Sequence, residues 1–191
     1  MSVTVSVETF IDNVKKILAE DDPQRPSYET LERLSYEMRD FAANPDVSSN
    51  GEEPSGNIHT GSQSRPLYED ESGLILVRAR FGPEAMTPIH SHGSWGVIGV
   101  YQGHDRYQVW RRLDEGTGDG EARVELIDER VMGPGDVAIL PPPPQDIHAQ
   151  QGENGETALE FVLFGANTMV LPRLYFDPEQ EIAREVTPGQ R

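Results

Sequence analysis

The sequence predicts a mainly β protein with two α-helices at its N-terminus. From residue 66 onward, short apolar segments alternate with turns rich in Gly, Pro, Asn and Asp. Six or seven short strands at this spacing are typical of a β-sandwich or β-barrel. The first 44 residues instead place apolar residues at helical spacing. The 18 Gly and 15 Pro residues among 191 suit a chain with many turns.

The two expected helices have recognisable ends. The first covers residues 8 to 20 and ends at Asp21-Asp22-Pro23. Its apolar stripe is Phe10, Val14, Ile17 and Leu18. Ser27 is the expected N-cap of the second helix, which Asn44-Pro45 closes. We expect the buried stripe of this helix to be Tyr28, Leu31, Leu34, Met38 and Phe41.

The chain is expected to divide into four parts. Residues 1–44 form the helical segment, and residues 45–65, rich in Ser, Gly and Pro, form a linker rather than a lid. Residues 66–172 form the β-barrel, and residues 173–191 form a charged tail with no assigned element. The predicted strands are 74–81, 95–101, 105–113, 122–132, 136–141, 146–151 and 158–165.

The charge and composition exclude several kinds of partner. With 33 acidic and 16 basic residues, the net charge of -17 argues against binding nucleic acid or an anionic membrane surface. No cysteine is present, so the chain has no disulfide, thiol nucleophile or thiolate metal site. The N-terminus does not resemble a signal peptide, and no apolar run reaches the length of a membrane span. We expect a cytoplasmic protein.

Three of the five histidines form a candidate metal site. His90 and His92 are separated by one residue, so on a strand both imidazoles point to the same face and can reach one metal ion. His148 follows a stiff corner of four prolines and can approach the pair from a neighbouring strand. His59 and His104 lie in polar segments and are expected to be solvated.

These histidines stand in two motifs that resemble those of the cupin superfamily. The first motif, Gly…His-x-His…Gly, runs from Gly82 through PIHSHGSWGVIGVYQG to Gly103. The second, Gly-Asp…Pro-x-x-x-His, runs from Gly135 to His148. The resemblance covers about residues 66 to 167. It implies a double-stranded β-helix, a jelly-roll barrel, with one metal ion held by His90, His92 and His148.

The residues just after the His-x-His pair narrow the resemblance to one branch of the superfamily. Many cupins carry a carboxylate ligand there, whereas residues 93–99, GSWGVIG, contain no acid. The chain therefore resembles the three-histidine thiol dioxygenases, which include cysteine dioxygenase. Bacterial members have Trp-Gly closely after His-x-His, as Trp95-Gly96 here, and Gly96 forbids the Cys–Tyr crosslink of the animal enzyme. This branch implies Fe(II), O2 and a small thiol acid that is converted into a sulfinate.

Two departures from this branch bear on the substrate. The Ser, His and Tyr of its late-strand relay correspond to Glu160, Val162 and Phe164. Val162 and Phe164 would make this wall of the substrate pocket apolar, while Glu160 either replaces part of the relay or faces solvent. Arg65 stands where an arginine of cysteine dioxygenase holds the substrate carboxylate, although it can also be an ordinary surface residue.

Other functions remain open at this point. Other three-histidine cupins use O2 to cleave a C–C bond of a diketone or keto acid. A zinc or manganese cupin could be a non-redox isomerase or hydrolase, and a metal-dependent sensor would need an output module that the sequence does not show. The expected partners are a small-molecule substrate and O2, in a monomer or homodimer.

Overall fold

The structure is a computed structural model, and it describes residues 6–44, 47 and 64–188. The predicted linker therefore lies outside the described residues except for Val47, Ser64 and Arg65, and so does His59. None of the helices in the described ranges is long and apolar enough to cross a membrane.

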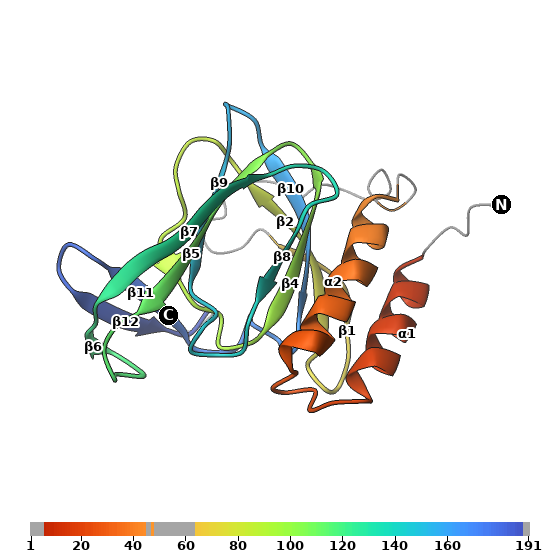
Figure 1. Cartoon of the computed structure of the whole chain (residues 1–191), viewed down its shortest axis with the longest axis horizontal. Helices are drawn as coiled ribbons and strands as arrows, with labels where there is room; N and C mark the ends of the chain where they lie inside the picture. Colours follow the sequence, from red (N-terminus) through yellow and green to blue (C-terminus); the bar gives the residue numbers. More distant parts are fainter. Residues whose placement is uncertain (1–5, 45–46, 48–63, 189–191) are drawn as a thin grey trace.

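Two N-terminal helices lie side by side against one face of the barrel (Figure 1). Helix α1 spans Val7–Leu18 and α2 spans Tyr28–Ala42. Ser6 and Ser27 are their N-caps, and each hydroxyl accepts a hydrogen bond from the backbone N–H three residues later. The predicted burial of Tyr28 is wrong, because α2 begins at this residue and its side chain is 67% exposed.

All seven predicted strands are present within a residue or two of their expected ends. The barrel strands are β1 (Arg65–Glu69), β2 (Ile75–Phe81), β3 (Ile89–His90), β4 (Gly96–Gln102), β5 (Asp105–Arg112), β6 (Gly120–Glu121), β7 (Val124–Met132), β8 (Val137–Leu140), β9 (His148–Gly152), β10 (Ala158–Phe164), β11 (Arg173–Asp177) and β12 (Ile182–Val186). Five of these, β1, β3, β6, β11 and β12, were not predicted as strands.

The strand order is that of a jelly roll. One sheet has the order β1-β2-β10-β4-β8 and the other β6-β12-β11-β3-β9-β5-β7, and every printed pairing is antiparallel. From β2 to β5, and again from β7 to β10, the chain crosses to the other sheet at each step. This alternation winds two antiparallel ribbons into a barrel, so the predicted double-stranded β-helix preceded by two helices is confirmed.

The charged segment after Pro172 forms part of the second sheet. Strand β11 pairs with β3, and β12 pairs with β11 and β6, at the end of the barrel away from the helices (Figure 1). Leu174 and Phe176 on β11 pack into a small apolar cluster with Ala183. The remaining positions of both strands are mostly charged or polar, which hid the strand pattern in the sequence.

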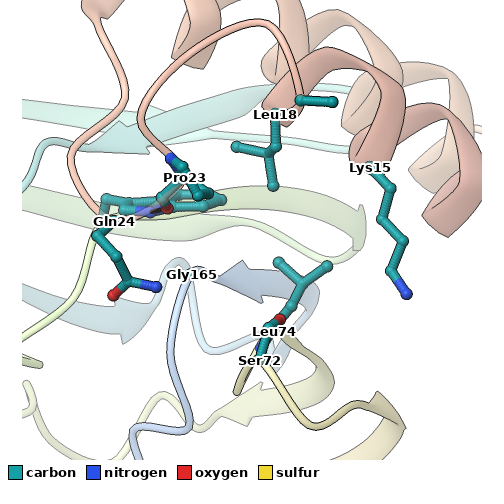
Figure 2. A pocket seen from close by; sticks show the side chains of 9 residues that line it. Lys15, Leu18, Pro23, Gln24, Ser72, Leu74 and Gly165 are labelled. Carbon is teal, nitrogen blue, oxygen red and sulfur yellow. Dashed lines mark hydrogen bonds between the residues drawn. The ribbon is translucent and has the colours of Figure 1, made fainter.

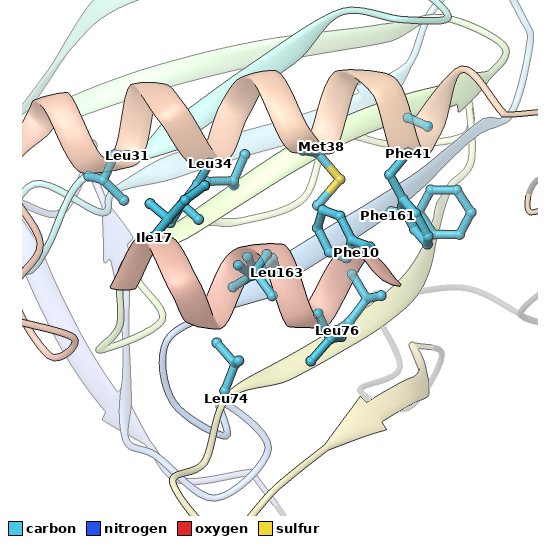
Figure 3. Packing of buried hydrophobic residues seen from close by; sticks show 14 of the residues in the cluster. Phe10, Ile17, Leu31, Leu34, Met38, Phe41, Leu74, Leu76, Phe161 and Leu163 are labelled. Carbon is cyan, nitrogen blue, oxygen red and sulfur yellow. The ribbon is translucent and has the colours of Figure 1, made fainter. Parts of the chain in front are cut away.

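The two faces of the first sheet are buried in two different cores. The face toward the barrel carries Ile75, Val77, Val162 and other residues of the interior. The opposite face packs against α1 and α2 through a large cluster (Figure 3). In that cluster Phe41 stacks on Phe10 with ring centroids 4.4 Å apart and contacts Phe161 at 4.8 Å. Both helices are thus anchored on the sheet that forms one wall of the barrel.

Truncating Phe41 to alanine should lower the free energy of unfolding by about 3–5 kcal/mol, because the ring is fully buried between both helices and β10. Urea unfolding measures the loss. Tyr36→Ala on the same helix is the control, and its 54% exposed side chain should cost no more than about 0.5 kcal/mol. Equal losses from the two variants would contradict the docked position of α2.

Candidate metal centre

The backbone places His90 directly opposite His148. Strand β3 lies between β9 and β11, and in this register His90 pairs with His148 on one side and Tyr175 on the other. Residues opposite each other on neighbouring strands point to the same face. The side chains of all three therefore gather on one surface, and the rings of His90 and His148 lie 4.6 Å apart.

His92 completes the group from the loop after β3. Its ring lies 4.7 Å from that of His90 and 5.1 Å from that of His148. One ring nitrogen from each residue lies within 4.8 Å of the others, and all three side chains are buried. The structure thus brings together the three histidines that the sequence predicted, and they can hold one metal ion.

The hydrogen bond of His90 and the protonation of His92 and His148 suit metal binding. Nδ1–H of His90 donates to the Pro88 carbonyl at 2.8 Å, which leaves Nε2 with its lone pair. Burial, and then the charge of His90, lowers the pKa of both His92 and His148 well below the usual value. Both imidazoles are therefore neutral, the form that binds metal ions.

The spacing of the nitrogens fits a shared metal ion. Nε2 of His92 and Nε2 of His148 are 3.0 Å apart. Two nitrogens that each lie about 2.1 Å from one ion, at a right angle, are separated by about this distance. Three imidazoles without a carboxylate suit iron, zinc, copper or nickel. Within the described ranges, no acidic side chain joins the three histidines as a ligand.

Val162 and Phe164 line the barrel interior, as the sequence predicted. Both belong to the interior apolar cluster, and the ring of Phe164 lies 4.7 Å from that of His92. The wall beside the candidate centre is therefore apolar at the two positions where the resembling enzymes carry histidine and tyrosine.

Arg65 is not brought to the histidines. It pairs with Arg78 across β1 and β2, so both side chains leave the same face of the sheet. That face is the one under the helices, where the guanidinium of Arg78 lies over the rings of Phe161 and Tyr101. Arg65 therefore points away from the barrel interior.

Arg173 and Tyr175 lie at the centre instead, and the sequence analysis missed both. Leu174 and Phe176 pack on the outer face of β11, so Arg173 and Tyr175 share the inner face. The ring of Tyr175 stacks on His90 at 5.8 Å, and the charge of Arg173 contributes to the low pKa of His92 and His148. The only available sequence signal was the alternation in Arg-Leu-Tyr-Phe.

The guanidinium of Arg173 has unused donor capacity. Its Nη2 donates to the Thr168 carbonyl at 3.0 Å, which fixes one end of the group. Its Nε is buried and has no hydrogen-bond partner among the described residues. A buried guanidinium donor beside the neutral rings of His92 and His148 attracts an anion.

Glu160 is fully buried in the barrel and does not face solvent. Nε2 of Gln150 donates to both Glu160 and Asp105 at 3.0 Å. Burial raises the pKa of Asp105 to about 6. Burial, and then the charge of Asp105, raises the pKa of Glu160 well above its usual value. The two carboxyl groups therefore share a proton at neutral pH. Gln150 stands two residues after His148, so this polar layer adjoins the candidate centre.

A separate pocket of about 240 Å³ lies between α1 and the sheet (Figure 2). Trp95 forms part of its wall, and its indole N–H donates to the Pro23 carbonyl at 2.9 Å. Lys15, the charged residue of this lining, is paired with Asp70 at 2.7 Å. The lining otherwise offers apolar groups, the amide of Gln24 and the hydroxyl of Ser72, so the histidine cluster is the stronger candidate for chemistry.

No protein-family model matches the sequence. Among solved structures, the chain is similar to a cupin-like protein from Thermotoga maritima, with 19% identity, 67% of this chain and 86% of that chain covered, and a TM-score of 0.43. It is similar to KdgF from Halomonas sp., with 17% identity, 58% and 85% covered, and a TM-score of 0.40.

An oxalate oxidase is also similar, at 22% identity and a TM-score of 0.39. That likeness covers 50% of this chain and 43% of the oxalate oxidase chain. At these scores the likenesses say nothing about the reaction, and the fold assignment rests on the strand order and register.

The shared proton of Asp105 and Glu160 predicts a stability that depends on pH. The folded protein holds a proton that the unfolded chain has released above its ordinary carboxyl pKa values, 3.8 and 4.5. The stabilisation from this pair is therefore complete below about pH 4. The part from Asp105 is lost as the pH rises through about 6, and the part from Glu160 continues to fall at higher pH. Glu160→Gln removes one titrating group, and its amide can donate to Asp105.

Urea unfolding at pH 5 and pH 8 checks this expectation. The wild-type protein should lose roughly 1–3 kcal/mol more between these pH values than Glu160→Gln does. The exposed Glu129, which accepts a hydrogen bond from Gln108, offers Glu129→Gln as a control that should behave like wild type. An unchanged pH dependence in Glu160→Gln would show that the buried pair holds no extra proton.

Proposed function

We propose that this protein is a non-heme Fe(II) dioxygenase that adds O2 to a small organic acid. The favoured substrate is a thiol acid, whose sulfur takes up both oxygen atoms to give a sulfinate. The observation that supports this most is the group of three buried imidazoles with one nitrogen each within 4.8 Å, of which those of His92 and His148 are neutral. A bound iron ion would supply open coordination positions and the redox chemistry that O2 requires.

The residues around the histidines support an anionic substrate. The chain carries a net charge of -17, yet Arg173 places a guanidinium beside His92 and His148. A substrate carboxylate can accept from the free Nε–H of Arg173, while the bond to Thr168 holds the guanidinium in place. We therefore assign to Arg173 the role that the sequence analysis gave to Arg65.

The apolar wall supports a compact substrate in a dry pocket. Phe164 and Val162 exclude water beside His92, which strengthens the interaction between Arg173 and a carboxylate. The ring of Tyr175 stacks on the imidazole of His90 and restrains its orientation. Asp105 and Glu160, which share a proton, lie in the barrel next to Gln150. Among the described residues, the candidate ligand set contains no acid–base group other than the imidazoles.

A second candidate is the oxidative cleavage of a C–C bond in a diketone or keto acid. The same apolar wall favours it, because Val162 and Phe164 stand where thiol dioxygenases carry a polar relay. A keto acid would also use Arg173. The two candidates differ in the substrate alone and share the metal centre.

Oxygen uptake by the Fe(II)-loaded protein tests the proposal. The panel contains small thiols, β-diketones and keto acids, and we expect uptake with a thiol acid. His148→Ala should abolish uptake and metal binding, whereas His104→Ala, an exposed histidine bonded to Glu156, should change neither. Uptake with a diketone or keto acid alone would favour C–C cleavage. Metal binding without uptake of O2 would favour a non-redox enzyme and would contradict the proposal.

Replacing Arg173 should weaken substrate binding selectively. Arg173→Gln should raise KM for the acid substrate by about 10- to 100-fold, the equivalent of one lost charge-assisted hydrogen bond. Arg65→Gln is the matched control, because Arg65 leaves the face of the first sheet that points away from the barrel interior, and its KM should stay within about twofold of wild type. A larger effect from Arg65→Gln than from Arg173→Gln would overturn the assignment of Arg173.

A further inference from the structure

Asp146 connects the two histidine motifs through one buried carboxylate. It stands two residues before His148 and is 1% exposed. Its Oδ2 accepts hydrogen bonds from the backbone N–H groups of His92 and Gly93, each at 2.8 Å. These contacts join segments more than 50 residues apart in the sequence, and they meet at the backbone that carries one of the candidate ligands.

The backbone of His92 has no strand to hold it. Strand β3 ends at His90, and the N–H of Ser91 still donates to the Leu174 carbonyl of β11 at 2.9 Å. From His92 onward the N–H groups turn to Asp146 instead. Gly93 has a φ of +69°, a conformation that lets successive N–H groups converge on one acceptor and that glycine adopts without strain.

The side chain of His92 has a hydrogen-bond contact only with another candidate ligand. Its Nε2 lies 3.0 Å from Nε2 of His148, while its Nδ1 is buried and forms no hydrogen bond within the described part of the chain. His90, in contrast, is held both by strand pairing and by the Pro88 carbonyl. Outside the three histidines, the hydrogen bond that positions His92 is therefore the one from its backbone to Asp146.

We propose that Asp146 is a positioning residue that sets the distance between the His92 and His148 rings. Because it precedes His148 on the same short segment, any shift of β9 moves the loop of His92 with it. The two Nε2 atoms thereby keep the 3.0 Å separation that a shared metal ion requires. The proposal rests on the metal centre of the proposed function but does not depend on which reaction that centre performs.

The variants separate positioning from a general structural role. Asp146→Ala removes the acceptor, while Asp146→Asn keeps an oxygen that can accept the same two N–H groups. Asp114 is the matched control, because its carboxylate also accepts from two backbone N–H groups, those of Gly116 and Arg123, in a turn between β5 and β7. Asp114→Ala therefore removes two bonds of the same kind away from the histidines, together with the ion pair of Asp114 with Arg112.

Anaerobic titration with Co(II) gives the dissociation constant and the visible absorption spectrum of the bound ion. Asp146→Ala should weaken Co(II) binding by about 10- to 100-fold and change the spectrum, as expected when a residue that orients a ligand is lost. Asp146→Asn should stay within about fivefold of wild type, with the wild-type spectrum. Asp114→Ala should bind Co(II) as wild type does, even if urea unfolding shows a loss of stability.

Several outcomes would overturn the proposal. Folded Asp146→Ala with wild-type affinity and spectrum would show that His92 needs no such support. Equal losses of affinity in Asp146→Ala and Asp114→Ala would assign Asp146 a general structural role. If Asp146→Ala does not fold, Asp146→Ser decides by the same readout, because its shorter side chain cannot span both N–H groups.

Wild-type protein that binds no Co(II) would refute the metal centre and this proposal together, whereas Co(II) binding without O2 uptake would refute the dioxygenase alone.

Discussion

Strand β3 contains only Ile89 and His90, and it is held between β9 and β11. That pairing puts His90 opposite both His148 and Tyr175. Because side chains on opposed residues share a face, the register alone brings an aromatic ring and two imidazoles together. A slip of one residue would turn the set to the other face and separate the rings. The jelly-roll winding matters for function because it brings together, at this strand, three segments that are far apart in the sequence.

Several polar groups of the barrel interior are neutral or share a proton. The imidazoles of His92 and His148 are neutral, and Asp105 and Glu160 share a proton around Gln150. Apolar residues such as Val162 lie between the barrel strands and keep the interior dry. A dry interior strengthens electrostatic interactions, which makes the single guanidinium of Arg173 effective against a substrate carboxylate.

The sequence predicts the helices, seven strands and the three histidines because these depend on local patterns. Apolar spacing and N-caps such as Ser27 mark the helices, and His-x-His marks one face of a strand. Arg173 could not be found in this way, because its short strand β11 was recognised only through its pairing with β3 and β12. Asp146 is likewise invisible, since its partners lie 53 and 54 residues away and are backbone groups. Arg65 was favoured by its position in the chain, and the register of β1 with β2 turns it to the other face.

The account requires that His90, His92 and His148 bind one ion together. X-ray absorption at the iron edge of the Fe(II)-loaded protein tests this directly, because imidazole rings give characteristic scattering beyond the first shell. We expect three imidazole nitrogens at about 2.1 Å, with the remaining ligands from solvent. The signal should fall to two imidazoles in His148→Ala that is loaded at high iron concentration. One or two imidazoles in the wild-type protein, or a signal unchanged in His148→Ala, would contradict the three-histidine centre.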